Sequence, residues 1–159
     1  MVHDAQVGTE ADGLERVYRE EAPRLWRALT GYTGDPEVAS DALAEAFAQA
    51  LARGGEIDSP QAWIWRAAFK IAAGELQRRG RERPSGPEPV TEFPEPIDHV
   101  VRALQRISPN QRLAVVLHDC ADRPTDEIAA ILGASRATVH VHLSQGRRRL
   151  RTLLEATDG

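Results

Sequence analysis

Cysteine, lysine and long apolar runs are almost missing from this chain of 159 residues. Cys120 is the only cysteine, so an intramolecular disulfide and a cysteine-rich zinc site are excluded, and a reducing, cytoplasmic setting is expected. No apolar run approaches the roughly 18 residues that a membrane-spanning helix needs. The first 13 residues are acidic and polar, and they lack the basic and apolar segments of a signal peptide.

Motifs for catalysis and metal binding are missing too. The chain has no glycine-rich phosphate loop and neither an HExxH nor a GxSxG pattern, so no enzyme activity is predicted. His140 and His142 are two residues apart, which on a helix points them in different directions and prevents them from sharing an ion. The adjacent His118, Asp119 and Cys120 have no second cluster to complete a zinc site. We expect no metal and no cofactor, and we interpret Cys120 as a small buried residue at a helix end.

The net charge of −4 is the average of two unlike parts. Five of the ten prolines fall within residues 81–98, which cannot sustain a helix and predict an extended linker that could reach roughly 56 Å. Residues 1–98 carry 11 basic and 18 acidic groups, a net of −7, whereas residues 99–159 carry 9 and 6, a net of +3. The acidic average argues against a general polyanion binder, yet it conceals a basic C-terminal segment.

Helix-forming residues dominate both parts, and strand-like alternation is absent. Asp35, Ser59 and Ser108 each place a capping side chain before a proline, which suits the first position of a helix. The sequence predicts an all-α fold of two small helical domains, with helices near residues 14–31, 36–53, 60–80, 97–107, 109–121, 125–132 and 136–154. The predicted organisation is a disordered tail (1–13), a helical domain (14–80), a proline-rich acidic linker (81–98) and a second helical domain (99–159).

The spacing within residues 125–146 predicts a helix-turn-helix. Such a unit needs a small residue where its helices cross, a glycine with positive φ in the turn and an apolar anchor on the second helix. Ala129, Gly133 and Val139 supply these three, and Ser135 is placed to cap the second helix. One buried stripe on that helix is predicted from Val139, Leu143, Gly146, Leu150 and Leu153.

The other face of the second helix is polar and basic, which predicts contact with DNA. Residues at the start of a recognition helix can reach base edges, and arginines further along can reach phosphates. The candidate DNA-binding residues are Arg136, Thr138, His140, His142, Gln145, Arg147 and Arg148. A helical hairpin with a solvated basic face is the alternative, but turn spacing, apolar stripe and basic face together favour DNA binding.

A second candidate DNA-binding strip lies in residues 60–80, where aromatic rings alternate with cations. Single-stranded DNA suits such a strip, because bases stack on rings while cations hold phosphates. Trp63 and Trp65 are two residues apart, so we predict that one is buried and the other lies near DNA. The candidates here are Trp63, Arg66, Lys70, Arg78 and Arg79.

A family resemblance joins these observations. The segment ISPNQRLAVVLHDCADRPTDEIAAILGASRATVHVHLSQGRRRLRTLL resembles the promoter-recognising C-terminal domain of bacterial RNA polymerase sigma factors. DALAEAFAQAL (residues 41–51) resembles the helix that docks on the polymerase clamp, and PQAWIWRAAFKIAAGELQRRGR (residues 60–81) resembles the helix that melts and reads the minus-ten element. Over residues 14–154 the chain is similar to the smallest, two-domain sigma factors, the extracytoplasmic-function (ECF) group.

The resemblance implies a transcription initiation factor that binds core RNA polymerase and reads promoter DNA at the minus-ten and minus-thirty-five elements. Asp41, Glu45 and Phe47 would bind polymerase, although Phe47 and Leu51 could instead be core residues. Residues 53–59 would form the pocket for an unpaired base. The resemblance also implies an anti-sigma partner and a chain that is monomeric outside its complexes.

Two rival functions remain open. The first is a sigma-like DNA-binding regulator that no longer initiates transcription, and the second is a helical adaptor or sequestering protein, suggested by the acidic first part. The first rival is motivated by residues that depart from the family pattern, namely Ala44, Lys70, Gly74, His140 and His142. Neutral histidines attract phosphates weakly, so we predict weak DNA binding by residues 99–159 alone.

Overall fold

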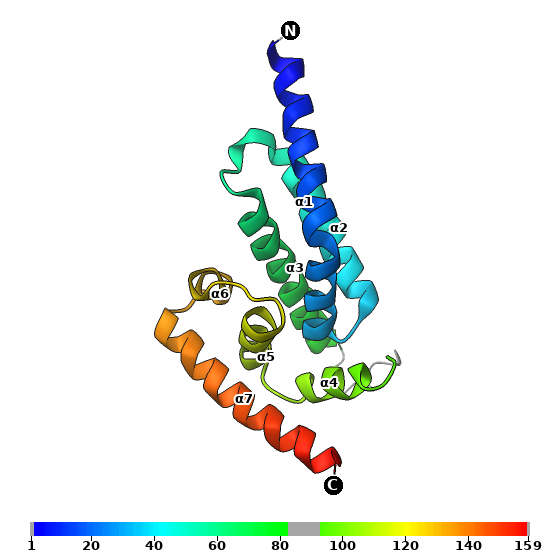
Figure 1. The fold of residues 1–159 in the computed structure, drawn as a ribbon, viewed down its shortest axis with the longest axis vertical. Coiled ribbons are helices and arrows are strands. Elements are labelled where there is room, and N and C mark those ends of the chain that lie inside the picture. The colour runs from blue at the N-terminus through cyan, green and yellow to red at the C-terminus, as the bar shows by residue number, and fades with distance from the viewer. Residues whose placement is uncertain (1, 83–92, 159) are drawn as a thin grey trace.

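The computed structural model describes the backbone of residues 2–82 and 93–158, and the side chains of residues 12–81 and 93–156. Within these bounds all regular structure is helical, which confirms the predicted fold class (Figure 1). Most of the predicted linker, residues 83–92, lies outside the described residues. None of the described helices is long and apolar enough to cross a membrane.

The N-terminal half, residues 2–82, is a bundle of three long helices with a short 3-10 turn, η1 (Gly54–Glu56). Asp35 caps the second helix as predicted, since its carboxylate accepts a hydrogen bond from the backbone N–H of Glu37 at 2.9 Å. The first helix begins at Val2 rather than near residue 14, and residues 2–13 contain no proline that would stop it. The three helices are α1 (Val2–Thr33), α2 (Pro36–Arg53) and α3 (Pro60–Glu82).

The C-terminal half, residues 93–158, holds the remaining helices. Ser108 and Gln111 form the predicted capping box, with reciprocal backbone-to-side-chain hydrogen bonds of 3.2 and 3.3 Å. Cys120 is exposed, so its predicted burial is wrong. The following residue, Ala121, is the one that is buried in the core. The elements are α4 (Ile97–Leu104), α5 (Pro109–Val115), the π-helical turn η2 (Val116–Cys120), α6 (Thr125–Leu132) and α7 (Arg136–Asp158).

The two halves share one hydrophobic core. Buried residues of α1 to α3, such as Leu25 and Phe69, belong to the same cluster as Leu117, Ile128 and Val139 from the C-terminal half. Figure 1 shows α4 beside the C-terminal end of α1 and α6 beside α3. Each half would bury less apolar surface alone, so their packing contributes to the stability of both.

A buried arginine joins the halves at the end of α1. Arg112 on α5 donates hydrogen bonds to the carbonyl oxygens of Leu104 at 2.8 Å and Tyr32 at 3.0 Å. Gln105 donates to the carbonyl oxygen of Gly31 at 3.1 Å. These donors satisfy carbonyl groups at helix ends that would otherwise be buried without partners. We call this contact the Arg112 joint.

Candidate nucleic-acid and partner interfaces

Helix α7, the second helix of the predicted helix-turn-helix, is positioned by the turn before it. Gly133 has φ of 65° and closes the turn in the left-handed conformation that the sequence predicts. The hydroxyl of Ser135 accepts a hydrogen bond from the backbone N–H of Thr138 at 3.1 Å, so it caps the helix as expected. Val139 is fully buried and anchors α7 against the rest of the C-terminal half.

Further along, α7 crosses α5 at close range. A Cβ on Gly146 would lie 3.0 Å from Cγ2 of Val115 and 3.3 Å from the carbonyl oxygen of Gln111. Only glycine fits this approach without a shift of α5, which explains the glycine in the predicted apolar stripe. The opposite face of α7 therefore points away from α5 and toward solvent.

The predicted DNA-binding residues of α7 differ in availability. Thr138 and His142 are half-buried, and Arg147 is held by Asp119 on η2 at 2.8 Å. This hydrogen bond with Arg147 is the main cause that holds the pKa of Asp119 below its usual range. Arg136 pairs with Asp126 at 3.0 Å, but both side chains are largely exposed and such a pair is weak. The exposed members of the predicted set are Arg136, His140, Gln145, Arg147 and Arg148.

Two further arginines were missed by the sequence prediction. Arg149 and Arg151 are exposed on α7 next to Arg148, and the described part of the chain holds no ion pair to any of the three. The run RRRLR at residues 147–151 could have indicated them in the sequence. The predicted apolar stripe of this helix passes through Leu150, so the arginines on either side of Leu150 must largely face solvent. They are the cations on α7 best placed to reach phosphates.

Only one of the two tryptophans on α3 is fully buried, which confirms that part of the prediction. Trp65 is fully buried and stacks on Phe69, with ring centroids 6.2 Å apart. Trp63 is half-buried, and the guanidinium of Arg53 lies 5.4 Å from its ring centroid. The segment at residues 53–59, which the family resemblance assigns to a base pocket, thus begins beside the more exposed of the two tryptophans.

The predicted cations of α3 fall into two groups. Arg66 and Lys70 are exposed. Arg78 and Arg79 both donate hydrogen bonds to Glu75 at 3.1 Å through their Nε atoms, and Arg79 also donates to Asp35 at 2.9 Å. The hydrogen bond from Arg78 is the largest cause that lowers the pKa of Glu75, to about 2. The C-terminal end of α3 is therefore a compensated charge cluster.

The predicted polymerase-binding residues lie on different faces of α2. Asp41 and Glu45 are exposed, whereas Phe47 is only 7% exposed and packs edge-on against Tyr18 at 4.8 Å. Phe47 is thus a core residue. Leu51 is not, because 60% of its surface is exposed.

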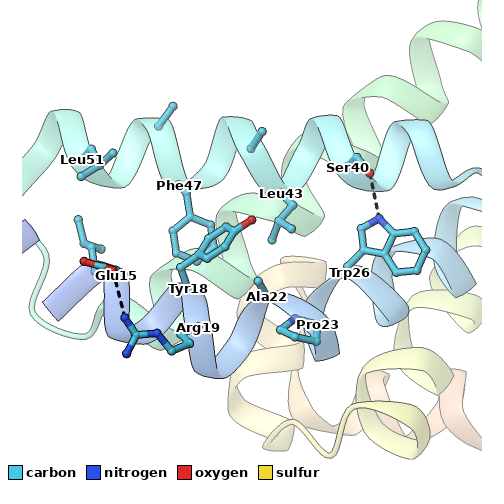
Figure 2. A pocket seen from close by; sticks show the side chains of 13 residues that line it. Glu15, Tyr18, Arg19, Ala22, Pro23, Trp26, Ser40, Leu43, Phe47 and Leu51 are labelled. Carbon is cyan, nitrogen blue, oxygen red and sulfur yellow. Dashed lines mark hydrogen bonds and ion pairs between the residues drawn. The ribbon is translucent and has the colours of Figure 1, made fainter. Parts of the chain in front are cut away.

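Between α1 and α2 lies an apolar groove of about 1140 Å³, which the sequence prediction missed (Figure 2). Its wall on α1 includes Tyr18 and Trp26, whose Nε1 donates a hydrogen bond to the hydroxyl of Ser40 at 3.0 Å. Tyr18 is 50% exposed, and Leu51 closes the wall on α2. An exposed apolar groove of this kind is typical of a surface that binds a protein partner. The helical spacing of Leu43, Phe47 and Leu51 was its signal in the sequence.

The part of the chain that the structure describes holds no candidate metal site. No group of three or more His, Cys, Asp or Glu side chains is arranged there to hold an ion. The exposed basic and apolar surfaces are the features that remain to be explained.

Comparison with known proteins gives these surfaces a context. The profile of sigma-70 region 4 matches residues 98–150. The ECF RNA polymerase sigma factor SigJ of Mycobacterium tuberculosis is 31% identical over 138 residues, which span 76% of this chain and 43% of that protein. The chain covers 43–61% of the length of SigJ and two further curated relatives.

Solved structures agree in fold. The crystal structure of SigJ matches with a TM-score of 0.64 and 26% identity, covering 89% of this chain and 53% of that one. The sigma factor RpoE of Bartonella quintana, solved with the anti-sigma factor NepR, matches with a TM-score of 0.73 and 21% identity over 89% of this chain and 96% of that chain. From its sequence relatives and its region 4 profile, this chain belongs to the ECF group of RNA polymerase sigma factors.

Proposed function

We propose that this chain binds core RNA polymerase, reads promoter DNA with α3 and α7, and promotes transcription initiation. The observation that carries the proposal is the outward basic face of α7, fixed by Gly133, Ser135 and Gly146 within a helix-turn-helix. Phosphate contacts from such a face position the helix, and its N-terminal residues read base edges. The proposal includes no covalent chemistry.

The functional organisation follows from these surfaces. Residues 14–80 would dock on polymerase and hold the unpaired strand of the minus-ten element, with Trp63, Arg66 and Lys70 on the exposed side of α3. Residues 99–159 would bind the minus-thirty-five element through α7. Residues 81–98 would connect the two units. The protein would act in the cytoplasm as a monomer outside its complexes.

The apolar groove supports polymerase docking at α1 and α2. Exposed acids at Glu37, Asp41 and Glu45 follow the neighbouring face of α2, and this helix carries no base before Arg53. A partner helix with an apolar stripe and a basic edge would match both features. The direct apolar contacts would then come from Tyr18 and Leu51 rather than from the buried Phe47.

An anti-sigma factor is a further expected partner. RpoE was solved with the anti-sigma factor NepR, and CnrH, another match in fold, with the cytosolic domain of CnrY. A protein of this kind would inhibit the present chain by covering the surfaces that dock on polymerase or bind DNA.

Run-off transcription with bacterial core polymerase and a genomic promoter library tests the proposal. Specific transcripts that depend on the added chain are expected. A chain that shifts promoter DNA without polymerase and yields no transcript would instead be a regulator. A chain that does neither but captures a protein would be an adaptor.

A matched pair of variants on α2 tests the docking surface. Leu51→Glu places a charge in the groove, whereas Ala52→Glu places the same charge at an exposed neighbour that does not line it. Leu51→Glu is expected to weaken core polymerase binding by about 10-fold or more, as for an apolar hot spot, and Ala52→Glu to leave it nearly unchanged. Equal affinities of the two variants in a core-binding titration would exclude the groove.

A further inference from the structure

Between the two halves, one tryptophan ring is contacted by two arginines. The guanidinium of Arg24 on α1 lies 5.4 Å from the ring centroid of Trp65, and that of Arg123 lies 4.7 Å from it. Arg24 and Trp65 both belong to the N-terminal half, whereas Arg123 comes from the turn before α6. The Arg123 contact therefore spans the halves, while the Arg24 contact does not.

Arg123 is held in a desolvated position. Its Nε and Nη2 atoms donate hydrogen bonds to Glu127 at 2.7 and 3.0 Å, and the two side chains are only 8% and 11% exposed. A guanidinium shielded from water interacts more strongly with an aromatic ring than an exposed one does. The tryptophan face and Glu127 together compensate the cost of burying the charge.

The backbone before Arg123 is unusual. Asp122 has φ of 58°, the left-handed region that residues other than glycine seldom adopt. The turn is closed by the backbone N–H of Arg123, which donates to the carbonyl oxygen of Leu117 at 2.8 Å. Strain of this kind persists where the surrounding structure enforces it and is often found at functional positions. Here the next residue is Arg123, whose guanidinium lies over the Trp65 ring.

The contact lies apart from the Arg112 joint. The joint fixes α4 and α5 to the C-terminal end of α1, whereas Arg123 and Trp65 bring α6 against α3, which lie side by side in Figure 1. In addition to the shared hydrophobic core, two polar contacts of different chemistry thus connect the halves. One is a set of hydrogen bonds to helix ends, and the other is the Arg123 side chain stacked on an aromatic face.

We infer that Arg123 is a latch, whose stacking on Trp65 holds α6 against α3 and whose release lets the C-terminal half move about the Arg112 joint. The structure shows the contact between Arg123 and Trp65. The role of its release rests on the proposed function. The closed arrangement holds α6 against α3 but leaves Arg66 and Lys70 exposed. In the proposed function residues 14–80 and 99–159 bind separate promoter elements, so binding both at once requires that the latch opens.

The latch can be tested with spin labels on the full chain. Exposed positions on α3 and α6, Gln77→Cys and Ala130→Cys in a Cys120→Ser background, report the distance between the two helices by double electron–electron resonance. The latch variant is Arg123→Met with Glu127→Gln, which avoids a buried unpaired carboxylate. A longer distance is expected, with a roughly 3- to 30-fold rise in the ratio of open to closed chains.

Two controls separate the latch from general loosening. Arg24→Met removes the other cation from the same ring, and Glu127→Gln alone keeps Arg123 in place; both should leave the distance distribution unchanged. If the latch variant keeps the narrow distribution of the unmodified chain, or Arg24→Met broadens it equally, the inference is overturned.

Adding core polymerase tests the role. The unmodified chain should shift to the longer distance, and the latch variant should do so at a lower polymerase concentration. Transcripts from a holoenzyme in which the labels stay at the closed distance would refute the role while leaving the proposed function intact.

Discussion

The two helices proposed to contact DNA carry similar numbers of cations but present them differently. On α3 the arginines near the C-terminal end, Arg78 and Arg79, donate hydrogen bonds to Glu75. On α7 the exposed Arg148, Arg149 and Arg151 have no ion pair within the described residues. Pairing therefore decides how much charge each helix offers to phosphate.

The difference extends to the apolar faces. Helix α3 buries Trp65 and Phe69 in the core that both halves share, whereas α7 contributes small and aliphatic residues at close approach. Thus α3 combines a structural role with an exposed strip of Trp63, Arg66 and Lys70. Helix α7 exposes one whole face to solvent, and in the proposed function this face contacts DNA.

The largest expected effect comes from the inner face of α3. Trp65→Ala should lower the free energy of unfolding by about 3–5 kcal/mol, because it removes a fully buried ring from the shared core. Trp63→Ala, two residues away, should cost roughly 1 kcal/mol, since its ring is half-buried. Urea unfolding followed by circular dichroism measures both. Equal losses would show that the two rings do not divide between core and surface.

Charge removal on α7 should have the next largest effect. Replacing Arg148, Arg149 and Arg151 by Gln should reduce the slope of log affinity against log salt by up to about 3, near one unit for each lost phosphate contact. The matched control is Arg78→Gln with Arg79→Gln on α3, which should change the slope by less than about 1 because these cations are compensated. Titrating duplex DNA with the full chain at several salt concentrations provides the slopes, and similar slopes for both variants would contradict the comparison.

Local chemistry made much of this architecture predictable from sequence. Asp35 and Ser108 before prolines marked helix starts, and the glycine at residue 133 marked the turn of the helix-turn-helix. The family resemblance supplied the functional surfaces. What the sequence left open or did not reveal depends on neighbours distant in the chain: whether Phe47 is buried, which its packing against Tyr18 decides, the groove beside it, and the pairing of Arg147 with Asp119. Residue type indicates that a side chain can bind, but only packing shows what it already binds.

Removing the Glu75 carboxylate, which compensates Arg78 and Arg79, should bring the positive charge that α3 offers to phosphate closer to that of α7. Glu75→Gln leaves Arg78 and Arg79 without their shared carboxylate, so the affinity for duplex DNA at low salt should rise by roughly 2- to 5-fold. The control is Glu45→Gln, which removes one exposed charge from α2 whose hydrogen bond comes from Gln49 rather than from these arginines. If both variants raise affinity equally, net charge rather than local pairing is responsible.

The smallest expected effect is a pH dependence of the stability that Glu75 contributes through its hydrogen bonds with Arg78 and Arg79. The pKa of Glu75 is about 2, below its ordinary value of 4.5, so its carboxylate stabilises the folded chain fully above about pH 4.5 and loses this contribution as the pH falls toward 2. The unmodified chain should therefore be more stable than Glu75→Gln near pH 6, and the difference should fade in acid. Because the pair is exposed, high salt should reduce it as well. Urea unfolding of both proteins between pH 6 and pH 2.5 measures the difference, and a gap that stays constant over this range would mean that the Glu75 carboxylate is not what holds Arg78 and Arg79 on α3.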